Sequence, residues 1–497
     1  MSNLYIPEGK SSFKLFLFTF SLAILTYGFA ITNYTLSIDN EIPILSDFGM
    51  ALGRWGQNLI RYHLFNGHLQ YFSFILSLFL FSLAAVRLTN LFKFENLSAY
   101  FFCGLFITFP QISYQVIFNM MADIAGLGVL LSVFSVDLFI KGYEAESLRK
   151  KIFLFFLVAV ILMFTLSMYQ AFIFVPTTIF VILFFQKTFQ NTFELKSEIK
   201  KMLLFGGVVL ISIAFYYLSV KLICPPIETG YLSTYVSGNS DNQFLNFCSI
   251  WLKNLVGSFY YGNRMFILTL LASLTMFVWF FINKKHALIR FLTLFVILLL
   301  PYLMSYFITN GYNPPRLFLT SNLVFAFVLV FTLNNFKISS FNITQIGIVL
   351  ICLTNFYFVT NLFYTINKIY KHDKKIAEKI DYTIQTKYPS FLTTEKLVCF
   401  YGYFPYEYHQ KFRLQDSEIF GGSFFNWDSG NNYRIINFFR EADIAEYKML
   451  ETKEQYNTVK DSIAKMPIWP DYGSVKMFNN IVVVKLGNEK GMPLPVE

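Results

Sequence analysis

Three carboxylates lie close together in a stretch that directly follows the first apolar segment of the chain. They are Asp39, Glu41 and Asp47. Charged side chains near lipid are costly and are mostly functional where they occur. An Asp or Glu in such a place can act as a general base that takes a proton from a hydroxyl group, typically worth about 10²–10⁴-fold in rate. Clustered carboxylates also suit hard cations, so the same side chains could ligate Mg²⁺ or Mn²⁺.

Basic and aromatic side chains follow these acids in the same stretch. Arg54 and Arg61 can each hold a phosphate through paired hydrogen bonds, and Trp55 stands beside the first of them. Carboxylates and arginines together indicate a site for an anionic lipid phosphate and a hydroxyl acceptor. The alternative is a solvated loop whose Trp55, His63 and His68 lie at the membrane interface.

Further polar residues stand at the expected ends of apolar segments. Asp123 lies just inside one segment, where an acid either faces the protein interior or pairs with a helix dipole. Tyr169 and Gln170 are either substrate contacts or a polar turn. Arg316 ends a Pro-rich loop, where it could bind phosphate or extend toward the interface.

Membrane-spanning helices must position these residues. Of the 497 residues, 55% are hydrophobic and 14% are charged, whereas soluble domains average about 25% charged. A span needs about 20 apolar residues. The sequence therefore predicts a polytopic α-helical membrane protein with about eleven spans. The predicted ranges are 13–35, 69–91, 98–118, 120–140, 152–168, 170–186, 202–223, 264–282, 288–308, 317–334 and 342–365.

The distribution of Lys and Arg predicts which side of the membrane each loop occupies. With the N-terminus inside, the segments on the inner side hold sixteen of these residues and the outer loops hold five. Cytoplasmic loops carry such an excess, so we expect a cytoplasmic N-terminus. An odd number of spans then places the C-terminus outside. The net charge of +10 reflects these loops, and we expect no nucleic-acid partner.

The composition divides the chain into two predicted domains. Residues 1–365 form the transmembrane domain, with a first outer loop at 36–68 and a second at 224–263. Residues 366–497 are polar and mixed, which indicates a small external α/β domain. Within it, 371–386 has the pattern of an amphipathic helix, and 396–401 and 481–486 have that of strands.

Several functional classes lack their signatures in this sequence. It has no P-loop, no Gly-rich nucleotide fingerprint and no HExxH. An ATP-driven pump and a zinc protease are therefore disfavoured, and no metal ligands are assigned. Cys224 and Cys248 fall in one predicted outer loop, where they are either a disulfide or two free thiols.

Four segments of the chain, in this order, resemble one family. They are the acidic stretch 38–41 followed by 52–55, then 166–172, then 422–430, and last 466–475 running into 481–486. The pattern resembles the bacterial serotype-converting O-antigen glucosyltransferases, which are polytopic enzymes of the GT-C superfamily.

The resemblance implies a reaction and a location. A glucosyl or other hexosyl group would pass from undecaprenyl phosphate to a hydroxyl of O-antigen, lipopolysaccharide or another lipid-linked or surface glycan. The reaction would occur on the outer side of the bacterial inner membrane, downstream of a polyprenyl-phosphate sugar synthase and a flippase. An acid of the first outer loop is the expected base, which carries over to Asp39 or Glu41, here separated by Asn40. No cofactor is expected, and a need for a divalent cation such as Mg²⁺ or Mn²⁺ is left open.

The external domain adds two candidate substrate contacts within the third segment of the resemblance. Trp427 could stack on a sugar of the acceptor, or could belong to the core of the domain, and Asp428 follows it. Two other functions remain open at this point. One is a lipid-linked glycan flippase or transporter that catalyses no reaction, and the other is an O-antigen polymerase or ligase, which would use diphosphate-linked oligosaccharides.

Overall fold

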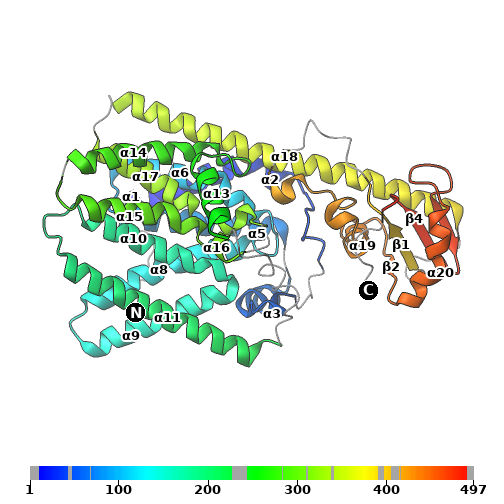
Figure 1. Cartoon of the computed structure of the whole chain (residues 1–497), viewed down its shortest axis with the longest axis horizontal. Helices are drawn as coiled ribbons and strands as arrows, with labels where there is room; N and C mark the ends of the chain where they lie inside the picture. The colour runs from blue at the N-terminus through cyan, green and yellow to red at the C-terminus, as the bar shows by residue number, and fades with distance from the viewer. Residues whose placement is uncertain are drawn as a thin grey trace. The chain divides into compact units, whose positions relative to one another are not determined.

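Most of the residues that the structure describes are helical, and a small sheet lies near the C-terminus (Figure 1). The computed structural model describes residues 10–42, 48–67, 69–225, 243–282, 284–308, 312–336, 341–389, 397–404, 414 and 416–489. The chain divides into two compact units. We call residues up to 31 together with 45–360 the helical unit, and residues 32–44 together with 361–497 the C-terminal unit.

Long apolar helices build the helical unit. Their bounds are α1 Lys10–Thr26, α5 Gln70–Leu91, α6 Asn96–Thr108, α8 Ala122–Glu144, α9 Leu148–Met168, α10 Phe174–Lys187, α11 Leu195–Ile223, α14 Ile267–Ile282, α15 Ala287–Leu299, α17 Ser321–Asn335 and the first part of α18 Phe341–Lys387. Shorter helical segments connect them. These are α2 Gly28–Thr32, α3 Phe48–Ala51, α4 Trp55–Asn58, η1 Leu59–Leu64, η2 Pro110–Ile112, α7 Ser113–Val116, η3 Gln170–Ile173, α13 Gln243–Leu255, η5 Asn263–Phe266, η6 Leu300–Tyr302, α16 Met304–Phe307 and η7 Pro315–Leu317.

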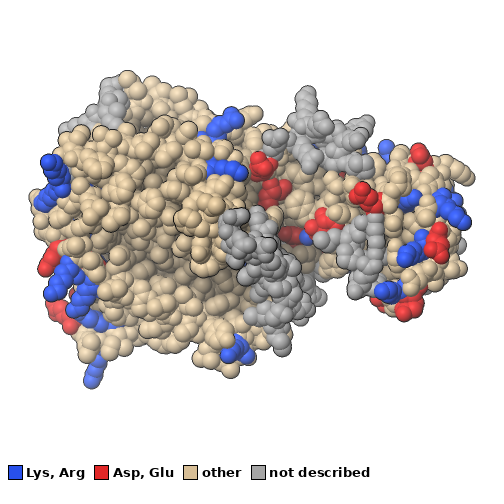
Figure 2. All heavy atoms as spheres, viewed as in Figure 1, with Lys and Arg blue, Asp and Glu red and all other residues tan. Residues whose placement is uncertain are grey.

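These helices make the chain a helical membrane protein. Among the described residues, seven helices are long and apolar enough to cross a membrane, and a bent pair at 96–116 would make an eighth. Three shorter apolar helices, at 11–26, 287–302 and 321–335, add to these. Each of the eleven predicted ranges overlaps one of these helices, whereas the number that cross the bilayer stays a prediction. On the face shown in Figure 2, the helical unit presents a broad area without charged side chains.

The predicted break between two spans near residue 169 is present. Helix α9 ends at Met168, and Tyr169 has an extended backbone with φ −160° and ψ 123°. The turn η3 then leads into α10. Tyr169 and Gln170 therefore lie at the junction of two helices. Backbone groups at helix ends have no partner within their own helix, so they can bind groups from other parts of the chain.

Helix α18 differs from the sequence-based expectation. The span at 342–365 and the amphipathic helix at 371–386 were expected to be separate, but one helix runs from Phe341 to Lys387. The intervening residues include no Gly or Pro, so nothing in the backbone ends the helix there. The predicted domain boundary at 365/366 thus falls inside this helix.

A mixed four-stranded sheet forms the core of the C-terminal unit. The strands are β1 Leu397–Tyr401, β2 Lys448–Met449, β3 Val475–Phe478 and β4 Ile481–Lys485, in the order β2-β1-β4-β3. Strand β1 pairs in parallel with β2 and β4, whereas β3 and β4 form an antiparallel hairpin. The two strands predicted from the sequence are therefore confirmed as β1 and β4.

Two helices, α19 Asn432–Glu441 and α20 Lys453–Ala464, accompany this sheet, with single turns η8 Glu418–Gly421 and η9 Trp427–Ser429. Helix α20 lies beside β4 and β1 in Figure 1. Its Tyr456, Val459 and Ile463 share a buried cluster with Cys399 of β1 and Val483 of β4. All five cysteines of the chain are free, so Cys224 and Cys248 form no disulfide.

The second part of α18 holds the C-terminal unit together. Asp373 accepts hydrogen bonds from Ser423 Oγ at 2.9 Å and from the Phe424 amide at 2.8 Å. Farther along the helix, Asp381 accepts from the Tyr447 hydroxyl at 2.6 Å. Polar side chains of one helix thus fix several loops of the same unit.

The segment 32–44 belongs to this unit rather than to the helical unit that precedes it in the chain. Asn367 of α18 donates from Nδ2 to the Tyr34 carbonyl at 3.0 Å and to Thr35 Oγ1 at 2.8 Å. The rings of Tyr34 and Tyr370 meet edge to face, 5.8 Å apart. The stretch that carries Asp39 and Glu41 is therefore anchored to α18.

Candidate functional site

Three carboxylates of the C-terminal unit surround one guanidinium group. Arg434 donates from Nη1 to Asp39 Oδ1 at 2.8 Å and to Glu41 Oε1, and from Nε to Asp428 Oδ2 at 2.5 Å. We call these four residues the Arg434 cluster. It unites the two predicted bases with Asp428, and its cation was not among the predicted site residues.

Local structure fixes the position of Arg434 at the start of α19. Asn431 caps this helix by accepting a hydrogen bond from the Tyr433 amide at 2.9 Å. Asn432 pairs with Phe400 of β1 in both directions, since its Oδ1 accepts from the Phe400 amide at 2.7 Å and its Nδ2 donates to the Phe400 carbonyl at 2.5 Å. The helix that carries Arg434 is thereby bound to the central strand.

Two of the carboxylates stand on left-handed backbone. Asp39 has φ 73° and Asp428 has φ 50°, a region that Asp and Asn enter more readily than other non-Gly residues. Gly430 continues the turn at φ 83°, and a Cβ there would lie 2.3 Å from the Gly402 carbonyl oxygen. Such conformations persist only where the surroundings enforce them, and they concentrate at functional sites.

The segment 422–430 also contacts the acidic stretch directly. A Cβ on Gly422 would lie 2.9 Å from both Ile38 Cγ1 and Trp427 Cε3. The Trp427 ring and Ile38 thus both meet the bare face of this glycine. Trp427 is half-buried, which leaves part of its ring for a ligand and part for the packing of the unit.

The electrostatics of the cluster separate the two predicted bases. Burial raises the pKa of Glu41 to about 7, with a further rise from Asp39 and a partial offset from Arg434. Burial alone would lower the pKa of Arg434, but the three carboxylates outweigh it, so the guanidinium stays charged. Within the described residues, Glu41 Oε2 is buried with no hydrogen-bond partner, which suits a carboxyl that holds a proton near neutral pH.

Exposure separates the same two residues. The side chain of Asp39 is 29% exposed and that of Asp428 30%, whereas that of Glu41 is 0% exposed. A substrate hydroxyl can therefore reach Asp39 but not Glu41 in this conformation. The arrangement provides an accessible carboxylate, oriented by a cation, beside a buried carboxyl that titrates near neutral pH.

A second polar group lies in the helical unit, and we call it the Arg54 cluster. It joins predicted residues with two others, Tyr216 and Ser219 of α11. Its members are Arg54, Trp55, Tyr169, Gln170, Tyr216 and Ser219. Gln170 is central, since it accepts from Arg54 Nε at 3.4 Å and donates to the Tyr216 hydroxyl at 2.9 Å and the Leu52 carbonyl at 2.9 Å.

The aromatic members of the Arg54 cluster complete it. The Arg54 guanidinium lies 4.9 Å from the centre of the Tyr169 ring, within range of a cation–π contact. Trp55 donates from Nε1 to Ser219 Oγ at 2.9 Å. The structure therefore brings four of the predicted substrate-binding residues together, from two separate parts of the chain, and α11 adds the other two members. Their role in binding stays a prediction.

Arg61 and Asp123 form an ion pair inside the helical unit. Arg61 Nη2 lies 2.8 Å from Asp123 Oδ1, and the two side chains are 3% and 2% exposed. Arg61 also donates to the Met120 carbonyl at 2.7 Å. Substrate binding by this pair stays a prediction, but its burial favours a structural role that ties η1 to the start of α8.

Arg316 lies in η7, close to the bent pair α6–α7. Gln111 donates to the Pro315 carbonyl at 2.6 Å, and Gln115 donates to the Arg316 carbonyl. The Arg316 guanidinium lies 4.9 Å from the centre of the Phe118 ring. Phosphate binding by Arg316 remains a prediction.

Two residues of the first outer loop, Asp47 and His68, lie outside the described residues. Across the part of the chain that the structure describes, no group of three or more His, Cys, Asp and Glu side chains could hold a metal ion. Asp39 and Glu41 bind Arg434 instead of pointing to a shared vacant position. The cation site of Asp39, Glu41 and Asp47 therefore stays a prediction.

The geometry defines a polytopic membrane protein with a carboxylate site on its C-terminal unit. The model of the family "Glucosyl transferase GtrII" matches residues 28–333. The chain therefore belongs to this glucosyltransferase family, as the resemblance to serotype-converting O-antigen glucosyltransferases predicted. Searches of curated proteins and of solved structures each find no match.

Proposed function

We propose that the protein transfers a glucosyl or other hexosyl group from undecaprenyl phosphate to a hydroxyl of a glycan acceptor. The acceptor is O-antigen, lipopolysaccharide or another lipid-linked or surface glycan. Membership of the glucosyltransferase family supports the transfer reaction, and the apolar helices suit a donor with a polyprenyl chain. The observation that carries the proposal is the Arg434 cluster, which offers one accessible carboxylate in a fixed orientation.

In the proposed mechanism Asp39 is the general base. The acceptor hydroxyl attacks the anomeric carbon of the donor while its proton passes to the Asp39 carboxylate. The bond between the anomeric carbon and the phosphate oxygen breaks, and polyprenyl phosphate leaves with the electron pair. Because a phosphate monoester is a good leaving group, no acid is needed on that side, and one base suffices. The transition state has oxocarbenium character, as in glycosidases.

Arg434 positions this base. Its planar guanidinium donates to Asp39 and Asp428 from different nitrogen atoms, which fixes the Asp39 carboxylate better than a point charge would. The protonation state of Glu41 sets the net charge of the cluster. With Glu41 protonated, the cluster holds two negative charges and one positive charge. Ionisation of Glu41 adds a third negative charge beside Asp39.

Within the helical unit, we propose that Arg54 binds the phosphate of the donor lipid. This side chain is half-buried and faces Tyr169 and Gln170. Arginine is suited to paired hydrogen bonds with a phosphate. Arg316 is a second candidate, whereas the buried Arg61 is not accessible in this conformation.

We further propose that the protein lies in the bacterial inner membrane with eleven spans. The N-terminus is then cytoplasmic and the C-terminal unit is external. The agreement between the predicted ranges and the apolar helices supports this topology, as does the excess of Lys and Arg in the loops assigned to the cytoplasm. An enzyme of this type depends on a synthase that makes the polyprenyl-phosphate sugar and on a flippase that moves it across the membrane.

A donor comparison in reconstituted vesicles tests the proposed reaction. Purified protein is supplied with radiolabelled undecaprenyl-phosphate glucose, with UDP-glucose, or with a diphosphate-linked oligosaccharide, each with lipid-linked glycan from the source bacterium. We expect label in the glycan only with the first donor, and EDTA tests the need for a cation. Labelling from the diphosphate-linked donor would contradict the proposal in favour of a polymerase or ligase. Movement of the lipid with no new glycosidic bond would contradict it in favour of a flippase.

A further inference from the structure

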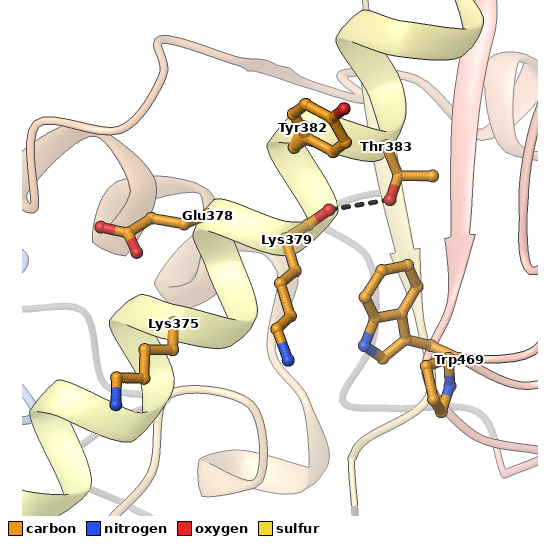
Figure 3. Close-up of a pocket in the computed structure, with 7 residues that line it drawn as sticks. Lys375, Glu378, Lys379, Tyr382, Thr383 and Trp469 are labelled. Atoms are coloured by element: carbon orange, nitrogen blue, oxygen red, sulfur yellow. Dashed lines mark hydrogen bonds between the residues drawn. The ribbon is translucent and has the colours of Figure 1, made fainter.

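A pocket opens on the surface of the C-terminal unit, and none of the four residues of the Arg434 cluster lines it. One wall is the second part of α18, and the other is the segment at Trp469 (Figure 3). The volume of the pocket is about 470 Å³. Its lining residues are Lys375, Glu378, Lys379, Tyr382, Thr383, Trp469 and Pro470.

Both walls of the pocket are bound to the same β-hairpin. At the end of α18, Lys387 donates from Nζ to the Val475 carbonyl at 3.1 Å, and the Met477 amide of β3 donates to the Tyr388 hydroxyl at 2.8 Å. On the other side, the Trp469 amide donates to the Lys485 carbonyl of β4 at 2.8 Å. The two walls therefore hold a fixed spacing, as expected of a largely pre-formed binding site.

A buried lysine fixes the segment that leads to Trp469. Lys485 is 4% exposed, although lysine is almost never buried without partners. Its ammonium group donates to the Met466 carbonyl at 2.8 Å and to the Ala464 carbonyl at 3.4 Å. Helix α20 ends at Ala464, so this one cation satisfies carbonyls at the helix terminus and orients the chain that carries the indole.

The side chains of the pocket combine aromatic surface with polar groups of both signs. Tyr382 is 71% exposed, a large fraction for an aromatic ring, and Trp469 is half-buried. Figure 3 shows Lys379 and Thr383 on the side of α18 toward Trp469, with Glu378 on a neighbouring side. The Thr383 hydroxyl bonds to the Lys379 carbonyl at 2.8 Å.

These groups fit a saccharide. A sugar ring has C–H faces that pack on an aromatic ring and hydroxyl groups that pair with both ammonium and carboxylate groups, and indole and phenol rings offer an apolar face with a polar edge. A volume of about 470 Å³ lies within the usual range of about 300–1,000 Å³ for small-molecule sites. Glu378 adds a carboxylate, which can accept a hydrogen bond from a sugar hydroxyl but not pair with an anionic lipid headgroup.

We propose that this pocket binds a sugar unit of the glycan acceptor, so that the C-terminal unit holds the acceptor at a place other than the base. This inference rests on the function proposed above, since it identifies where that enzyme would bind its acceptor. Trp469 supplies the stacking surface, Tyr382 covers the sugar from the rim, and the charged groups of α18 pair with hydroxyls.

Binding of polysaccharide to the full-length protein in nanodiscs tests the inference without donor. The probe is radiolabelled, delipidated envelope polysaccharide from the source bacterium. We expect Trp469→Ala to raise its Kd by roughly tenfold or more and Tyr382→Ala by several-fold, as for central aromatic residues of binding sites. Tyr472→Ala is the matched control, because Tyr472 is 95% exposed and does not line the pocket. We expect it to bind as the wild type does.

A second variant and a kinetic measurement distinguish loss of binding from misfolding of the Trp469→Ala protein. Trp469→Phe keeps an aromatic face, and we expect it to bind within about threefold of the wild type. In transfer assays Trp469→Ala should raise the KM for the acceptor and leave the KM for the donor unchanged. Equal Kd values for the wild type, Trp469→Ala and Tyr382→Ala would overturn the inference, as would binding to phosphatidylglycerol vesicles in place of polysaccharide. Because no donor is present, failure of the transfer reaction itself would appear separately, as wild-type protein that binds glycan but transfers nothing.

Discussion

Arg434 donates a hydrogen bond to Glu41, a carboxylate that precedes it by 393 positions in the chain. The bond joins the acidic stretch after the first span to a helix near the C-terminus. The segment 422–430 contributes Asp428 to the same guanidinium. Two of the four segments of the family resemblance thus meet at one arginine.

Replacement of Arg434 should reduce transfer even when the charge is kept. Lysine at this position cannot donate to Asp39 and Asp428 from one rigid plane, so we expect Arg434→Lys to lower kcat by roughly tenfold or more. Arg434→Gln should also destabilise the fold, at the lower end of the roughly 3–5 kcal/mol that loss of one partner of a buried ion pair costs. Arg440→Lys, on the exposed side of the same helix, is the control. Equal activity of the two lysine variants would contradict the positioning role.

Glu41 should make the stability of the protein depend on pH. Its pKa is about 7 in the folded protein against 4.5 for the free side chain. The folded protein therefore binds this proton more tightly than the unfolded chain does. Below about pH 4.5 the carboxyl is protonated in both states, so Glu41 leaves the free energy of unfolding unchanged. As the pH rises, ionisation of Glu41 lowers the free energy of unfolding, and the loss is complete above about pH 7, where it reaches roughly 3 kcal/mol.

Thermal unfolding in detergent between pH 4 and pH 8 measures this effect. We expect Glu41→Gln to gain stability relative to the wild type as the pH rises to 7, with a constant difference above that. Glu441→Gln, a partly exposed carboxylate, should follow the wild type. Parallel curves for the wild type and Glu41→Gln would show that Glu41 does not titrate in this window.

Arg54 and Arg61 should respond differently to alanine substitution. Arg54 is half-buried beside Tyr169, so we expect Arg54→Ala to raise the KM for the donor by about tenfold with little change in Tm. Arg61→Ala removes one partner of a buried pair and should destabilise the protein by about 3–5 kcal/mol. In a double-mutant cycle, Asp123→Asn should add little to Arg61→Ala. A normal donor KM for Arg54→Ala would remove Arg54 from the phosphate site.

Asp373 should be needed to keep the segment 422–430 in place. It accepts hydrogen bonds from the Ser423 hydroxyl and the Phe424 amide, all buried. Asp373→Ala leaves these donors unpaired, which costs about 1–3 kcal/mol for each. We expect faster limited proteolysis within 422–430 and reduced transfer, whereas Asp461→Ala on the exposed face of α20 should change neither. Unchanged protease protection would contradict this role.

Much of the architecture could be predicted because it depends on local pattern. Apolar runs of about 20 residues define helices directly, and alternating or β-branched runs identified β1 and β4. The break at Tyr169 was predictable because two polar residues interrupt an apolar run. The prediction divided helix α18 because the composition changes from apolar to polar at residue 366. A helix can continue from lipid into water, however, when no Gly or Pro interrupts it.

Some residues of the site could not be predicted, because they join it through contacts between segments that are distant in the sequence. Asp39 and Glu41 were predicted because acids near a membrane are rare. Arg434 lies in a polar helix in which an arginine is unremarkable, and its role follows only from the fold that brings it to the acidic stretch. Its position six residues after Asp428 was the only available signal. Tyr216 and Ser219 were missed for the same reason, since both lie in an apolar span.

The role of Asp39 as the base is tested by comparing Asp39→Asn with the wild type in the reconstituted transfer assay. The variant keeps the shape of the side chain and can still meet Arg434, but it cannot accept a proton. We predict a loss of about 10²–10⁴-fold in kcat, with donor binding and Tm close to those of the wild type, and a smaller loss for Glu41→Gln. Full activity of Asp39→Asn in a folded protein would contradict the assignment of Asp39 as the base.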